Sequence, residues 1–287
     1  MQGEAETQVR AWVEYFRDLG VHDLYRRGEP APQAASEAEA VTATPDAAVE
    51  NGVPFALEGP SAPPIAETIS VTPDRLISFN ELAPVPSSAI PAAEREAVLR
   101  AIQDEIGDCT RCPLAYAGRH KIVFGDGPAT ARLMFVGEGP GADEDAQGLP
   151  FVGKAGQLLN NMIGAMGLAR AEVYIANIVK CRPPGNRVPE PAEANICSQF
   201  LLRQIDVVRP EAIVALGATA ATYLLGVKQS LSSLRGRWHR CRGAKLAVTY
   251  HPAFLLRDPR QKAEAWKDLQ MVMRELGLTP PAPRTKT

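Results

Sequence analysis

The chain has 287 residues, 45% of them hydrophobic, which is enough for one large domain or two small ones with a buried core. No apolar run approaches the ~20 residues that span a bilayer, and the N-terminus carries acidic residues instead of a basic segment followed by an apolar one. We therefore expect a cytoplasmic protein and not a membrane protein.

The net charge of -2 hides two parts of opposite charge. Up to Ala92 the chain has 5 Lys and Arg against 14 Asp and Glu, and from Ala93 onward it has 26 against 19. The basic part suggests a polyanionic partner. A surplus of solvated arginines without such a partner is the plainer alternative.

The acidic part has two regions of different composition. Residues 1–28 contain an amphipathic helical pattern, with apolar residues such as Val9, Trp12 and Phe16 on one side. Residues 29–91 are rich in Ala, Pro, Glu, Ser and Thr, which is typical of a disordered linker. The helix is expected to bind a partner protein or to fold back on the domain at residues 92–279, which a flexible tail follows at residues 280–287.

From residue 93 onward, helical and strand patterns alternate. Alternation of this kind predicts an α/β three-layer sandwich with a central, mostly parallel four-stranded sheet. The strands are expected at residues 133–136, 173–179, 212–216 and 246–250, and the helices at 93–106, 153–166, 190–208, 218–225 and 262–276.

The first strand leads into the glycine-rich loop GEGPG at residues 137–141, which can form a pocket floor because glycine has no Cβ to hold a ligand off. This loop also fits a dinucleotide-binding fingerprint, which requires a helix to begin in the loop. The next segment, ADEDAQGLP, is acidic and lacks an apolar period, so we expect no helix there and disfavour nucleotide binding. Phe151 follows this segment and is expected on the rim of the pocket.

Ligands of such sheets bind at the carboxyl ends of the strands, where the glycine-rich loop, Asn177 and His251 all fall. A lone histidine is more often structural than catalytic. His251, however, precedes an apolar pair that is expected to be exposed, Leu255 and Leu256, and then Arg257. An apolar wedge beside arginines suits a protein that enters a base stack and holds phosphates. Alternatively, the leucines belong to the apolar face of the last helix.

Four of the five cysteines form two spaced pairs, Cys109 with Cys112 and Cys181 with Cys197. A cytoplasmic chain disfavours disulfides, so the C-x-x-C favours metal binding. The second pair is too open for a zinc knuckle, and four thiolates suit a cubane iron–sulfur cluster. A zinc site and unrelated buried cysteines stay open as alternatives. Cys241 is expected to pack in the core.

Together these segments resemble the iron–sulfur family of uracil-DNA glycosylases, family 4, over about residues 93–278. The matching segments are the CxxC at Cys109, GEGPG followed by GLPFVGKAGQLL, ANIVKCRPP, Cys197 and HPAFLLR. The resemblance implies a DNA-repair enzyme that hydrolyses the N-glycosidic bond of uracil in single- or double-stranded DNA. It also implies a 4Fe-4S cluster held by Cys109, Cys112, Cys181 and Cys197. We expect a monomer.

The resemblance further implies how the site works, because such enzymes turn the target nucleotide out of the helix and read it in a pocket. The Asn177 amide would donate to uracil O4 and accept from N3–H, and His251 would donate to O2, where negative charge develops. Leu255 or Leu256 would fill the vacated stack, beside Arg257. The implied uracil-binding residues are Gly137, Glu138, Gly139, Phe151 (which stacks on the base), Asn177 and His251.

One position departs from the wider superfamily. Gly139 stands where the best-known uracil-DNA glycosylases have an aspartate that orients the attacking water. Glu138 and Glu144 are the candidates for positioning the attacking water or the loop.

Two other functions stay open. The chain could bind or covalently capture uracil in DNA, or it could be a non-catalytic iron–sulfur adaptor. Relatives that capture uracil carry an extra basic loop with a histidine after the segment equivalent to ANIVKC. Residues 182–189, RPPGNRVP, contain no histidine, which favours turnover.

Overall fold

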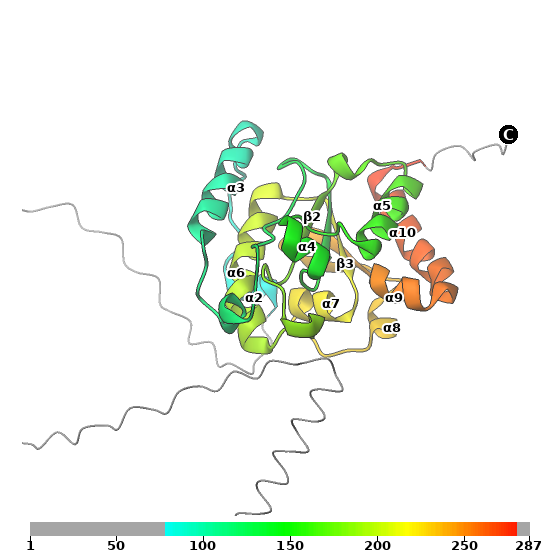
Figure 1. The fold of residues 1–287 in the computed structure, drawn as a ribbon. Helices are drawn as coiled ribbons and strands as arrows, with labels where there is room; N and C mark the ends of the chain where they lie inside the picture. Colours follow the sequence, from blue (N-terminus) through cyan, green and yellow to red (C-terminus); the bar gives the residue numbers. More distant parts are fainter. Residues whose placement is uncertain (1–77, 280–287) are drawn as a thin grey trace, which may run out of the picture. The chain divides into compact units, whose positions relative to one another are not determined.

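A computed structural model describes residues 78–279, and a five-stranded sheet forms the centre of this part (Figure 1). The strand order is β2-β1-β3-β5-β4, with β4 antiparallel to β5 and the other pairs parallel. Every residue of β1, β2 and β3 is buried, as expected for parallel strands covered on both faces. The bounds are β1 Leu133–Gly137, β2 Tyr174–Asn177, β3 Ala212–Leu216, β4 His239–Cys241 and β5 Ala244–Thr249.

Helices cover the two faces of the sheet (Figure 1). The α-helices are α2 (Phe79–Leu82), α3 (Ala92–Ile106), α4 (Ala142–Gln147), α5 (Lys154–Ala165), α6 (Pro191–Val208), α7 (Ala218–Leu225), α8 (Leu231–Leu234), α9 (Pro252–Arg257) and α10 (Lys262–Leu276). Short 3-10 turns are η1 (Pro113–Tyr116), η2 (Arg170–Glu172), η3 (Pro184–Asn186) and η4 (Pro259–Gln261).

Alternating side chains of the strands divide the core into two layers. Met134 and Val136 of β1 belong to the cluster with α3, α6 and α7, whereas Leu133 and Phe135 belong to the cluster with α5 and α10. This alternation is the period of two of a strand. The three-layer α/β sandwich expected from the sequence is confirmed.

The expected count of four strands is wrong, because β4 adds a short antiparallel strand at the edge beside β5. Within β4 only Cys241 is buried, and His239 and Arg240 are more exposed. Three residues with a single buried side chain lack the apolar run or alternation that predicts a strand. Pairing with β5 orders them, and Cys241 lies in the core.

A helix also begins in the glycine-rich loop, where none was expected. α4 starts after Gly141, whose N–H donates to the Glu144 carboxylate at 3.1 Å. Three acidic residues in its first turn are stabilised by the positive end of the helix dipole, which compensates for the missing apolar period. The same carboxylates would repel a pyrophosphate, so the loop lacks the chemistry of a dinucleotide site.

Residues 78–91, expected to belong to a disordered linker, pack on the domain. α2 buries Phe79, which is 1% exposed, in the core. The guanidinium of Arg242 donates to backbone carbonyls of three residues in this segment and pairs with Asp206 at 2.5 Å. Tertiary contacts therefore order a segment whose own composition does not.

The predicted helix in residues 1–28, the linker up to residue 77 and the tail at residues 280–287 lie outside the described residues. Between residues 78 and 279, no helix combines the length and the apolar character that crossing a bilayer requires.

Candidate active site

Three chain segments meet at the carboxyl-terminal edge of the sheet. β1 ends at Gly137, and the adjacent β2 ends at Asn177, which lies opposite Gly137 in the strand register. β5 ends at Thr249, and His251 follows as the N-cap of α9. Because parallel strands place these ends along one edge, the structure gathers the groups that the sequence predicted at separate strand ends.

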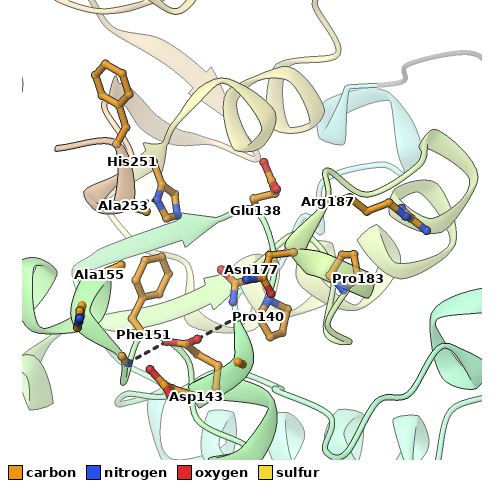
Figure 2. Close-up of a pocket in the computed structure, with 18 of the residues that line it drawn as sticks. Glu138, Pro140, Asp143, Phe151, Ala155, Asn177, Pro183, Arg187, His251 and Ala253 are labelled. Carbon is orange, nitrogen blue, oxygen red and sulfur yellow. Dashed lines mark hydrogen bonds between the residues drawn. The ribbon is translucent and has the colours of Figure 1, made fainter. Parts of the chain in front are cut away.

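A cavity of about 530 Å³ opens between these segments (Figure 2). This volume is in the range of sites that bind small molecules. Its walls come from the glycine-rich loop, the first turns of α4 and α5, the end of β2, the segment after it, and α9. Among the lining residues are Glu138, Gly139, Glu144, Phe151, Asn177, His251 and Arg257.

Phe151 and Asn177 meet against Gly137 at the end of β1. A Cβ at position 137 would lie 2.4 Å from Asn177 Oδ1 and 2.7 Å from Phe151 Cζ, so only glycine leaves room for both side chains. Asn177 is 1% exposed, and its Oδ1 has no hydrogen-bond partner within residues 78–279. A buried oxygen without a partner costs stability. This one lines the cavity, where a ligand N–H could reach it.

The imidazole of His251 lies near Phe151, with ring centroids 5.6 Å apart. Its Nδ1 accepts a hydrogen bond from the Ala253 N–H at 3.1 Å, so the proton of the neutral ring is on Nε2. Burial, and to a smaller extent the charge of Arg257, lowers the pKa of His251 to about 4. At neutral pH the ring is therefore an uncharged N–H donor.

The two candidate acids have different surroundings. Glu144 accepts hydrogen bonds from the N–H groups of Gly141, Val152 and Gly153 at 2.9 to 3.1 Å, which engages both of its oxygens. Its carboxylate thus ties together the segments before α4 and α5. Glu138 lies at the wall of the cavity (Figure 2).

The structure separates the two leucines of HPAFLLR. Leu256 is 44% exposed, but Leu255 is 1% exposed and lies against α5 and α10, near Met162 and Trp266. The expectation of an exposed pair is therefore wrong for Leu255. Consecutive residues of a helix point in different directions, and α9 is packed against α5, so only one leucine reaches the surface.

The four predicted metal ligands gather away from this pocket. Cys109 and Cys112 follow α3, Cys181 follows β2, and Cys197 lies in α6, yet all four line one small cavity. Apolar side chains and Lys180 complete its wall, and burial raises the pKa of the Cys197 thiol to about 12.

Two arginines point donors at these sulfur atoms. Arg119 donates to Cys181 Sγ at 3.4 Å, and Arg111 donates to Cys109 Sγ at 3.6 Å. In the described part of the chain, no three Cys, His, Asp or Glu side chains are grouped as a single metal ion would require.

Three contributors to the pocket were not predicted. The Ala253 N–H fixes the imidazole proton, Arg187 lines the cavity, and Arg170 donates to the Phe151 carbonyl at 3.0 Å. Arg187 could have been noticed, because it lies in the loop after the second predicted strand. The other two contacts involve backbone groups, the Ala253 N–H in the first turn of α9 and the Phe151 carbonyl, and such contacts leave no motif in the sequence.

Comparison with known proteins decides the family. Residues 124–270 match the sequence profile of the uracil DNA glycosylase superfamily. A type-4 uracil-DNA glycosylase of Thermotoga maritima is 45% identical over 168 residues, which cover 57% of this chain and 86% of that protein. The chain belongs to the type-4 uracil-DNA glycosylases.

Two further type-4 uracil-DNA glycosylases give similar values. The protein of Pyrobaculum aerophilum is 40% identical over 181 residues, covering 60% of this chain and 92% of its own length. That of Archaeoglobus fulgidus is 39% identical over 178 residues, covering 58% and 88%.

As a member of this family, the chain hydrolyses the N-glycosidic bond between uracil and deoxyribose and acts in base excision repair. Its substrate is DNA, which agrees with the excess of basic residues from Ala93 onward. The alternatives of a protein that only captures uracil and of a non-catalytic adaptor are thereby set aside.

Proposed function

We propose that the cavity holds a uracil base turned out of DNA and that Asn177 reads it. The observation that carries this proposal is the buried, unpartnered Oδ1 of Asn177. Uracil offers N3–H to this oxygen and accepts from Nδ2 at O4, while Phe151 stacks on the ring. Cytosine reverses both groups and would leave buried polar atoms unpaired, which disfavours it.

His251 stabilises the departing base in this proposal. Breaking the glycosidic bond places negative charge on uracil, mostly on O2. The Nε2–H of the neutral imidazole donates to O2, helped by the backbone N–H groups near Glu138 and Gly139. A fixed donor in a buried site interacts more strongly as the charge grows, so it lowers the barrier without any proton transfer.

Glu138 is the better candidate for positioning the attacking water. A Cβ at Gly139 would lie 2.7 Å from Val179 Cγ2, so an aspartate at this position would force a shift of its neighbours. Backbone N–H groups already engage both oxygens of Glu144, whereas Glu138 lines the cavity. We assign water positioning to Glu138 and loop positioning to Glu144.

We assign the contacts with DNA beyond the flipped base to α9. Leu256, the exposed leucine, fills the space that the flipped nucleotide leaves, and Arg257 binds a neighbouring phosphate. Action on single or double strands, a monomeric state, a cytoplasmic location and a protein partner for residues 1–28 stay predictions.

The cysteine cavity is proposed to hold a 4Fe-4S cluster, which type-4 enzymes typically bind. The donor set fits this group, because four thiols surround one cavity and two guanidinium groups donate toward their sulfur atoms. When bound, the cluster would supply a cross-link between the segment after α3, the end of β2 and α6.

The reading of uracil is tested by Asn177→Ala. We predict that release of uracil from a labelled oligonucleotide slows by about 100-fold or more, since a site built to hydrogen-bond its substrate loses that much without the contact. Asn161→Ala, at an exposed position of α5, is the control and should keep the wild-type rate. Wild-type uracil release by Asn177→Ala would refute the assignment.

A further inference from the structure

Phe151 has a backbone conformation that residues with a side chain rarely adopt. Its φ is +53°, in the left-handed region, although it is a bulky residue. Such a conformation persists only where the surroundings determine it, and it is common in functional sites. The contacts that hold Phe151 therefore affect the position of its ring relative to the base.

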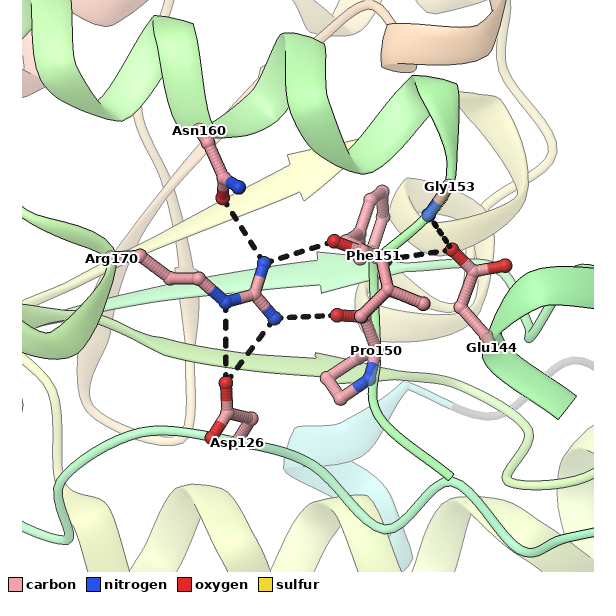
Figure 3. A network of polar contacts seen from close by, with 8 residues as sticks. Asp126, Glu144, Pro150, Phe151, Gly153, Asn160 and Arg170 are labelled. Atoms are coloured by element: carbon pink, nitrogen blue, oxygen red, sulfur yellow. Dashed lines mark hydrogen bonds and ion pairs between the residues drawn. The ribbon is translucent and has the colours of Figure 1, made fainter. Parts of the chain in front are cut away.

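Arg170 holds the carbonyl side of this segment (Figure 3). Its Nη1 donates to the Phe151 carbonyl at 3.0 Å and to Asn160 Oδ1 at 3.1 Å. Its Nη2 donates to the Pro150 carbonyl at 2.5 Å. One planar group thus fixes two successive carbonyls, on either side of the Phe151 Cα.

Glu144 holds the amide side of the same segment (Figure 3). Its Oε1 accepts from the N–H of Val152 at 2.9 Å and of Gly153 at 3.1 Å. Helix α5 packs closely against this segment, because a Cβ at Gly156 would lie 1.9 Å from the Phe151 carbonyl oxygen. Cation, anion and helix together fix the peptide groups around Phe151.

Arg170 is itself anchored to the sheet. Its Nε and Nη2 donate to Asp126 Oδ2 at 3.3 and 3.2 Å. The backbone of Asp126 exchanges hydrogen bonds with Ile175 of β2 at 2.7 and 2.9 Å. The chain of contacts therefore runs from the strand that carries Asn177 to the aromatic residue of the pocket.

These contacts leave Arg170 no donor for DNA. A guanidinium has five N–H groups, and Arg170 makes five hydrogen bonds, all to protein atoms. A phosphate contact would have to break one of them. Its geometry suits the support of a loop.

We propose that Arg170 is a positioning residue for uracil excision, which holds the Phe151 ring at the place and angle where it stacks on the base. This inference rests on the proposed stacking role of Phe151. Without the guanidinium, Phe151 is free to leave its left-handed conformation, and the ring moves away from the position that Asn177 and His251 require.

The test is a double-mutant cycle on the full chain, with single-turnover release of uracil from an oligonucleotide as the readout. We expect Arg170→Gln to slow release by roughly 10- to 100-fold, the scale of a small misplacement in an active site. In a Phe151→Ala background the same substitution should change the rate by less than about two-fold, because the side chain it positions is gone.

Affinity for DNA distinguishes a positioning role of Arg170 from a general loss of structure. Affinity for an oligonucleotide with an abasic-site analogue should stay at the wild-type value, since Arg170 contacts no phosphate in this proposal. Arg132→Gln is the matched control, because Arg132 makes a bidentate pair with Glu211 and a bond to the Leu276 carbonyl at the opposite end of the strands. If Arg170→Gln does not fold, Asp126→Asn weakens the anchor alone and should give a smaller loss of the same kind.

The outcomes distinguish this inference from the function on which it rests. Equal slowing by Arg170→Gln with and without the Phe151 ring, or a wild-type rate in Arg170→Gln, overturns the positioning role. A wild-type rate in Phe151→Ala alone instead overturns the stacking role. Slowing that disappears in the Phe151→Ala background supports both.

Discussion

The imidazole of His251 is held as a neutral donor by the first turn of α9, where the Ala253 N–H engages its Nδ1. We predict that His251→Ala raises the free-energy barrier for uracil release by about 2.7 to 4 kcal/mol, which slows the reaction by ~10²- to 10³-fold. This is the usual effect of losing one such donor. Single-turnover kinetics with a uracil oligonucleotide measure it. An unchanged rate would remove His251 from the mechanism.

The pH profile distinguishes a neutral from a charged imidazole. Because burial lowers the pKa of His251 from 6.5 to about 4, the ring stays uncharged from neutral pH down to roughly pH 5. The single-turnover rate should therefore show no step near pH 6.5. A rate that fell as the pH rose through 6.5 would mean that the protonated ring is the active form.

Single residues of the pocket were predictable where a motif followed a strand. Asn177 and His251 lie at strand ends and Phe151 lies in the segment between β1 and α5, and the structure brings all three to one cavity. Arg170 could not be predicted, because it contacts backbone carbonyls of a loop whose path depends on the whole fold. Leu255 was misplaced because a helix of six residues is too short to show which side is apolar.

At the scale of elements, the long helices and the buried strands followed from their apolar patterns. β3, α7 and α10 have the bounds expected for them. Two of the elements that were missed, α4 and β4, are short and polar. Their order comes from a helix dipole that favours acidic residues and from pairing with a neighbouring strand, and neither produces an apolar period.

The segment with α2 gives a test at this scale. We predict that deletion of residues 1–91 gives a less stable protein than deletion of residues 1–77. Burial of Phe79 alone contributes about 1.5 to 3 kcal/mol, and the loss of its segment leaves Arg242 without three of its carbonyl partners. Urea unfolding of the two proteins measures the difference. Equal unfolding free energies would show that residues 78–91 add nothing.

At the scale of the whole molecule, the chain combines a pocket at one edge of the sheet with a second, cysteine-lined cavity. The two are linked along the chain, because Asn177 and Cys181 are separated by three residues at the end of β2. Buried Lys180 strengthens this link, since its Nζ donates to the Asn177 carbonyl at 3.0 Å. Support at the second cavity would therefore steady the strand end that carries Asn177, the residue proposed to read the base.

The cluster proposal is tested by the metal content of the purified protein. We predict a brown protein with about four irons per chain. Cys197→Ser should lose iron and colour, whereas Cys241→Ser should keep both, because Cys241 lies in the core on β4 and does not line the cysteine cavity. Iron measured by elemental analysis decides, and zinc in its place would contradict the proposal.

The most direct test of the account is a crystal structure of the protein with free uracil. We predict that the ring lies against Phe151, with N3 within hydrogen-bond distance of Asn177 Oδ1 and O2 facing His251 Nε2. Uracil bound elsewhere, or bound in this cavity with Asn177 Oδ1 still unpartnered, would contradict it.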